Sequence, residues 1–81
     1  MTAIDITTHK DPARVLRQAC EPNINPRGTI IVYHYGDYAD NVHQTVAGRA
    51  AWDLHKEDKV ILCQKMLDDE PRRYAYCAVL K

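Results

Sequence analysis

The feature that most constrains the fold is the C-terminal half of the chain, where a helical apolar pattern precedes two strand-like runs. Between Asn41 and Glu57 apolar residues recur at helical spacing, so one stripe can face a core: Val42, Val46, Ala47, Ala50, Ala51 and Leu54. Asn41 and Gln44 form a capping-box pattern at the start. Gly48 costs about 1 kcal/mol relative to alanine inside a helix, which indicates close packing against another element. We therefore expect one long helix over residues 41–57.

Two β-rich runs follow this helix. They flank a polar turn that contains a proline, Asp68-Asp69-Glu70-Pro71, and so predict a β-hairpin. In one register Leu67 lies opposite Arg73, and apolar side chains collect on one face. The other pairs of that register are Cys63–Cys77, Leu62–Ala78 and Val60–Leu80. A second register stays open, because a change of one residue in the turn shifts every pair.

The N-terminal half predicts a helix, a loop and a strand. Asp11 followed by Pro12 is a helix-start signal, and the apolar residues after it favour a helix over residues 12–20. Residues 21–28 contain two prolines, two asparagines and a glycine, which is typical of a loop. Residues 29–35 are β-branched and aromatic, which predicts the strongest strand. Residues 1–10 fit either a short edge strand or an ordered tail.

These elements predict one small α/β (α+β) domain over residues 1–81, in the order α-β-α-β-β. A chain of 81 residues has room for a single thin core, which favours a binding module over an elaborate enzyme. Eleven basic residues balance eleven acidic ones, so the net charge favours neither nucleic acid nor an anionic membrane. The sequence has no membrane-spanning run and no signal-peptide pattern, and we expect a cytoplasmic protein.

The histidines and cysteines match no metal-binding or catalytic pattern. The three cysteines, Cys20, Cys63 and Cys77, lack CxxC spacing, so we expect free thiols packed as small apolar side chains. Cys63 or Cys77 could approach His34, but a thiol inside an apolar strand is usually inert. We therefore expect a protein that is not an enzyme and has no cofactor. Trp52 should be at least half buried on its helix.

Four segments resemble short, mostly uncharacterised proteins of bacteriophages and prophages that have a strand, a helix and a hairpin arranged as in a winged helix. The resemblance covers residues 29–81 and is carried by Tyr33-His34-Tyr35-Gly36-Asp37, Ala50-Ala51-Trp52-Asp53-Leu54, Val60-Ile61-Leu62-Cys63-Gln64-Lys65 and Tyr74-Ala75-Tyr76-Cys77-Ala78-Val79. It implies a winged-helix-like fold and a phage or mobile-element origin. It brings no catalytic residues with it.

The charged hairpin tip and its neighbours are the candidate partner-binding residues: Asp68, Asp69, Glu70, Arg72, Arg73, Lys65, Arg49 and Tyr38. The first hypothesis is an interaction protein that binds and inhibits or redirects a host protein or nucleoprotein complex, for example a defence complex of the CRISPR type. The second is a winged-helix DNA-binding regulator, in which the acidic start of the tip would repel phosphate. A homodimer stays open.

Overall fold

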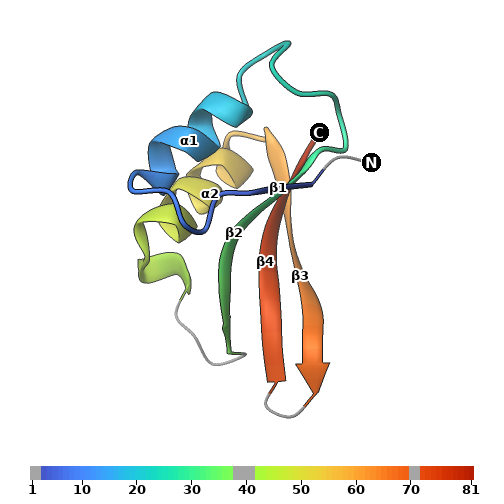
Figure 1. The fold of residues 1–81 in the computed structure, drawn as a ribbon. Coiled ribbons are helices and arrows are strands. Elements are labelled where there is room, and N and C mark those ends of the chain that lie inside the picture. Colours follow the sequence, from blue (N-terminus) through green and yellow to red (C-terminus); the bar gives the residue numbers. More distant parts are fainter. Residues whose placement is uncertain (1–2, 38–41, 70–71) are drawn as a thin grey trace.

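The computed structural model describes residues 3–37, 42–69 and 72–81, which form a four-stranded sheet with two α-helices (Figure 1). In chain order the elements are β1 (Ala3–Asp5), α1 (Pro12–Ala19), β2 (Ile30–Asp37), a 3₁₀ turn η1 (Val42–Gln44), α2 (Val46–Lys56), β3 (Val60–Asp69) and β4 (Arg72–Leu80). The expected α+β domain is confirmed. The predicted order of α-β-α-β-β is preceded by the short strand β1.

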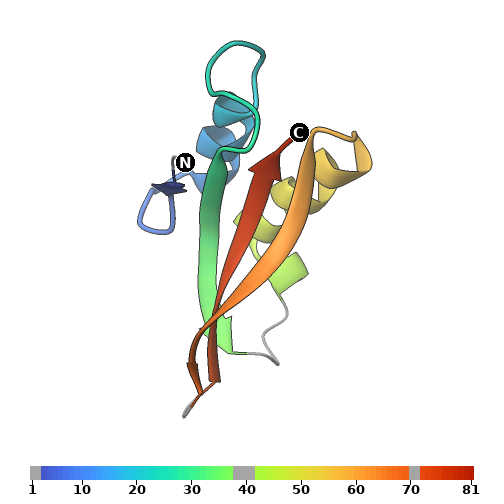
Figure 2. The same cartoon turned by 90° about the vertical axis from the view of Figure 1, so that its right-hand side faces the viewer.

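The sheet has the strand order β1-β2-β4-β3. Strand β1 runs parallel to β2, and β4 pairs antiparallel with both β2 and β3. Both helices lie on the same side of the sheet. Figure 2 looks onto the other side of the sheet, with the helices behind it. Of the two alternatives for residues 1–10, the structure therefore has the edge strand.

Helix α1 begins where the sequence predicts. The side chain of Asp11 accepts a hydrogen bond from the backbone N–H of Arg14 at 3.3 Å, and Pro12 occupies the first turn, where a missing N–H costs nothing. Leu16 and Ala19 are buried against the core. Across the helix pair, Arg17 lies 3.7 Å from Asp53 and 3.5 Å from Glu57, exposed ion pairs that contribute at most about 1 kcal/mol each.

Helix α2 is shorter than the predicted 41–57 and starts at a different cap. Its N-cap is Thr45, whose hydroxyl accepts from the N–H of Gly48 at 2.9 Å and donates to the carbonyl of Val42 at 2.6 Å. Asn41 lies outside the described residues, and Gln44 belongs to the 3₁₀ turn. The predicted capping box is therefore wrong, because the chain makes a separate tight turn before α2 begins.

One face of α2 consists of small residues and packs closely on the sheet. Its buried residues are Ala47, Gly48, Ala50, Ala51 and Leu54. A Cβ atom added at Gly48 would lie 1.7 Å from the carbonyl oxygen of Val42, so the close packing inferred from this glycine is confirmed. At the other end Asp58 adopts a left-handed conformation (φ +64°), which closes the helix and turns the chain into β3.

The hairpin has the register expected over most of its length. Cys63 pairs with Cys77, Leu62 with Ala78 and Val60 with Leu80. The predicted partnership of Leu67 with Arg73 is wrong, because a bulge between Met66 and Asp68 leaves Leu67 as the extra residue and places Asp68 opposite Arg73.

The expectation that this register gathers apolar side chains on one face is also wrong. Successive pairs of a strand point to opposite faces. The pairs at Val60 and Leu62 face the helices and belong to the core or pack against it. The pair at Cys63 faces the other way, so both faces of the hairpin carry apolar residues.

Candidate functional site

The side of the sheet opposite the helices is apolar although the described residues place no other element on it (Figure 2). Strand alternation assigns to this surface, which we call the open face, residues that do not belong to the core cluster: Ala3, Asp5, Ile30, Val32, Tyr35, Ile61, Cys63, Lys65, Arg73, Ala75, Cys77 and Val79. Ile61 and Tyr35 are 51% and 41% exposed. The open face thus exposes apolar surface chiefly on its two flanking strands, at Tyr35 of β2 and at Ile61 and Cys63 of β3.

The centre of the open face lies on β4 and the larger side chains flank it. Ala75 and Cys77 are nearly covered, because longer side chains of β2 and β3 stand on both sides of them. On β2, the Tyr35 hydroxyl donates a hydrogen bond to the Asp5 carboxylate at 2.9 Å. Hydrogen bonds, chiefly from the hydroxyl and the backbone N–H of Thr7, lower the pKa of Asp5. The rim on the β1 and β2 side is therefore the hydrogen-bonded pair of Tyr35 and Asp5. The rim on the β3 side consists of Ile61 and Lys65.

Strand β3 is an edge strand, and part of its unpaired backbone edge is covered or interrupted. The N–H of Lys81 donates to the carbonyl of Lys59 at 3.2 Å, so hydrogen bonds to β4 fall on the odd-numbered residues of β3 up to the bulge. The backbone groups of Val60, Leu62 and Gln64 consequently point to the free edge. A ring nitrogen of His55 lies 3.3 Å from the Val60 carbonyl and covers the first of them. The bulge after Met66 interrupts the other end, as in protected edge strands.

The predicted partner-binding residues do not form one cluster. Lys65 and Arg73 are exposed and lie on the open face near the hairpin end, whereas Arg49 is exposed on α2, on the opposite side of the sheet. The backbones of Asp68 and Asp69 pair with those of Arg73 and Arg72 at the end of the hairpin, which projects beyond the helices in Figure 1. Glu70 and Tyr38 lie outside the described residues.

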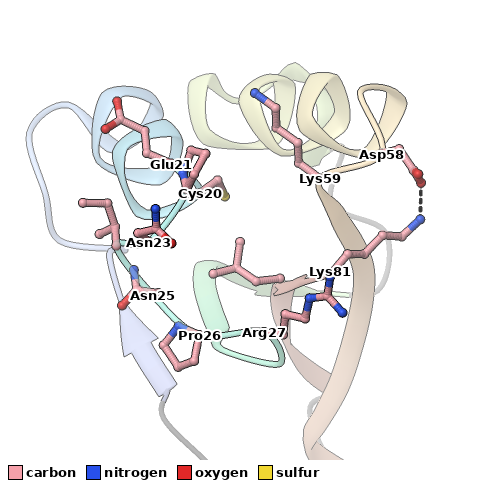
Figure 3. Close-up of a pocket in the computed structure, with 12 residues that line it drawn as sticks. Cys20, Glu21, Asn23, Asn25, Pro26, Arg27, Asp58, Lys59 and Lys81 are labelled. Atoms are coloured by element: carbon pink, nitrogen blue, oxygen red, sulfur yellow. Dashed lines mark hydrogen bonds and ion pairs between the residues drawn. The ribbon is translucent and has the colours of Figure 1, made fainter.

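A wide hollow of about 770 Å³ lies at the other end of the molecule, between the loop after α1 and the turn after α2 (Figure 3). Its lining residues are Cys20, Glu21, Pro22, Asn23, Ile24, Asn25, Pro26, Arg27, Asp58, Lys59, Leu80 and Lys81. The sequence interpretation missed it, because it is assembled from a loop, a turn and the last residues of β4, which are far apart in the chain. No local motif connects these segments.

The polar side chains around the hollow largely contact one another. Lys81 reaches Asp58 across one side, and this hydrogen bond lowers the pKa of the Asp58 carboxyl (Figure 3). Lys59 lies 3.4 Å from Glu57, and the Asn25 amide donates to the Ala19 carbonyl at 3.0 Å. These contacts shape the loop and the turn, and no nucleophile and base are paired among the lining residues.

The three cysteines are free thiols in different surroundings: Cys63 is exposed, Cys20 is half-buried and Cys77 is buried. Burial raises the pKa of Cys20, and burial together with the neighbouring Cys63 raises the pKa of Cys77 to about 11. The expectation that Cys63 is packed as an apolar side chain is wrong, because it sits on the open face of an edge strand.

Native-state thiol labelling should separate these three sites. We expect Cys63 to react first with a maleimide and Cys77 to react at an appreciable rate only after unfolding, because exposure and thiolate content both control reactivity. Peptide mapping after brief labelling measures this order. The Cys63→Ser variant should lose the fast phase, whereas fast labelling of Cys77 in folded protein would contradict its burial.

The described residues contain neither a metal-binding cluster nor a membrane-spanning helix. Among residues 3–37, 42–69 and 72–81, no group of three or more histidine, cysteine or acidic side chains is arranged to hold a metal ion. Neither α-helix in the described part of the chain has the length and apolar character to cross a bilayer.

Comparison with protein-family models, curated proteins and solved structures finds no match for this chain.

Proposed function

We propose that this chain is a small, non-enzymatic interaction protein of phage or mobile-element type. It binds a host protein or nucleoprotein complex, for example a defence complex of the CRISPR type, and inhibits or redirects it. The observation that carries the proposal is the apolar open face. The partner surface has an apolar centre that covers this face and charged groups that meet the rim at the hairpin end.

The open face departs from the usual pattern of a two-layer domain. A sheet covered by helices on one side normally alternates apolar residues inward with polar residues toward water. On the side away from the helices, the residues of β4 that follow Arg73 are Ala75, Cys77 and Val79. The residues of β2 on this side include Ile30 and Val32. Ala75 and Cys77 are covered by their neighbours, and Ile61 and Tyr35 expose the most apolar surface on this face. Apolar side chains exposed on a face that no other described element covers typically mark a protein-binding site.

The charge distribution suits a rim around this apolar surface. Lys65 and Arg73 lie on the open face near the hairpin end, and the sequence adds three acidic residues at the tip. Charges at an interface rim steer association and select partners more than they add affinity. By sequence, the three acids at the tip suit a partner with arginine or lysine at the matching position.

A winged-helix DNA-binding protein is the alternative function, in which α2 would read the major groove and the hairpin would be the wing. On the outer side of α2, Arg49 and Lys56 could contact phosphate, but Lys56 lies 3.4 Å from Asp53 and is partly neutralised. Asp53 and Glu57 also lie within ion-pair distance of Arg17 of α1. Basic and acidic side chains therefore alternate on this surface, whereas phosphate binding favours a patch of basic side chains.

The test compares two apolar-to-acidic substitutions on opposite sides of the molecule. Ile61→Glu places a carboxylate in the open face, and Val46→Glu places one at the first turn of α2, where 62% of the valine is exposed and the helix dipole favours an acid. Each tagged variant and the wild type are used to capture proteins from host lysate, with and without nuclease, and the captured partner is then titrated with purified protein.

We expect Ile61→Glu to weaken binding at least about tenfold, because an unpaired carboxylate in an apolar interface costs more than about 1.4 kcal/mol. Val46→Glu should bind as the wild type does, and binding should survive nuclease and moderate salt. Equal binding by both variants would refute the open-face site. Binding that nuclease abolishes, with affinity for duplex DNA that falls steeply with salt, would support the DNA-binding alternative instead.

A further inference from the structure

Cys63 and Cys77 are direct partners on neighbouring antiparallel strands and both lie on the open face. Because the Lys59–Lys81 pair is hydrogen-bonded, the alternation of the ladder makes Cys63–Cys77 a hydrogen-bonded pair as well. Such pairs have Cα atoms about 5.5 Å apart, within the roughly 4.4–6.8 Å that disulfides span. Both thiols are free, and one of them is accessible to solvent.

We propose that Cys63 and Cys77 form a redox-active dithiol site that low-molecular-weight disulfides, such as glutathione disulfide, oxidise to a disulfide between β3 and β4. In the first step the Cys63 thiolate attacks one sulfur of the external disulfide, whose S–S bond breaks and releases one thiolate. In the second step the Cys77 thiolate attacks Cys63 Sγ and releases the other. The two cysteines lose two electrons and two protons, and the external disulfide becomes two thiols.

The surroundings of the two thiols determine the order of these steps. Cys63 is exposed and can meet an external disulfide, whereas Cys77 is only 5% exposed. Burial, followed by the charge of Cys63, raises the pKa of Cys77 to about 11, so little of it is thiolate at neutral pH. Once Cys63 is in a mixed disulfide it carries no charge, which removes the second of these causes. Closure should still be the slow step and should accelerate as pH rises.

The same geometry makes the disulfide easy to reduce. Hydrogen-bonded partners hold their Cβ atoms about 5.5 Å apart, whereas a disulfide draws them to about 3.5–4.5 Å. The strands must therefore approach each other, and strained disulfides are the more readily reduced ones. Cys20 offers no competing partner, because it packs against the core on the helix side of the sheet.

The test exposes the folded full-length chain to glutathione disulfide at several pH values and follows intact mass after acid quenching, with peptide mapping of the cross-link. Wild type and the matched control Cys20→Ser should lose two hydrogens and show a Cys63–Cys77 cross-link that forms faster at higher pH. Cys77→Ser should stop with one glutathione on Cys63, and Cys63→Ser should react far more slowly than wild type. Cys77→Ala, which keeps a small apolar side chain, replaces the serine variant if thermal melting shows that the latter is unfolded.

Three outcomes would overturn the proposal. Wild type could accumulate the glutathione adduct without closing, which would show that the strands hold the thiols too far apart. The cross-link could contain Cys20, which would show a different pairing. Cys63→Ser could be modified as fast as wild type, which would show that Cys63 is not the entry site. None of these readouts depends on a binding partner, so they are independent of the proposed function.

Discussion

Replacing Gly48 with alanine should destabilise the protein strongly, by about 2–3 kcal/mol or more, although alanine is the better helix former by about 1 kcal/mol. The added methyl group would lie 1.7 Å from the Val42 carbonyl oxygen. That oxygen cannot easily move, because it accepts hydrogen bonds from the Thr45 N–H at 3.1 Å and the Thr45 hydroxyl at 2.6 Å. The clash therefore forces η1 and α2 apart. In a domain of this size the loss should lower the melting temperature by roughly 10 °C or more.

The matched control for Gly48→Ala is Val46→Ala, at an exposed position of the same helix. Alanine removes a β-branched side chain that is 62% exposed and improves helix propensity, so stability should be unchanged or slightly higher. Thermal melting followed by circular dichroism measures both variants. If Gly48→Ala melts at or above the temperature of the wild type, the 3₁₀ turn does not pack on α2 as described.

The sequence predicted the start of α1, most of the hairpin register and the close packing at Gly48, because each depends on residues close together in the chain. Asp11 and Pro12 start α1 because a cap and a preset φ act within one turn of chain. Cys63 was placed opposite Cys77 because the turn length leaves few registers. Gly48 indicated close packing because a glycine inside a helix is otherwise only a cost.

The start of α2 could not be located from the same kind of signal. Asn41 and Thr45 are both good N-caps, and the sequence does not show that a 3₁₀ turn separates them. The turn is stabilised by the packing of Val42, which is 5% exposed in the core, and by the Thr45 hydroxyl. Tertiary contact thus selected the later cap.

The candidate site was harder to predict. Alternation along a strand shows which face of a sheet is buried only when the other face is polar. The strands are apolar on both faces, so the sequence did not reveal which face the helices cover. Cys63 was accordingly expected to be packed as a small apolar side chain and is exposed. All the partner-binding residues except Tyr38 are charged, and charge alone does not show that Arg49 lies on the far side of the sheet from Lys65 and Arg73.

The second large effect is expected for Leu54→Ala, compared with Trp52→Ala two residues earlier on α2. Leu54 is 1% exposed and belongs to the core cluster, so its truncation leaves a cavity and should cost about 2–5 kcal/mol. Trp52 is 44% exposed, which means that slightly more than half of its surface is covered, as the sequence predicted. It stacks obliquely on His55, with ring centroids 5.5 Å apart.

Although tryptophan is the larger side chain, Trp52→Ala should cost less than Leu54→Ala, about 1–2 kcal/mol, because truncation at a partly exposed site leaves no enclosed cavity. Trp52 also borders a small hollow of about 180 Å³ that Tyr33 and Leu62 help to line, so solvent already reaches its neighbourhood. Chemical denaturation of both variants measures the difference. Equal losses would show that Trp52 is a core residue. A small loss of stability accompanied by a complete loss of partner binding would instead place the interface on the helix side and remove it from the open face.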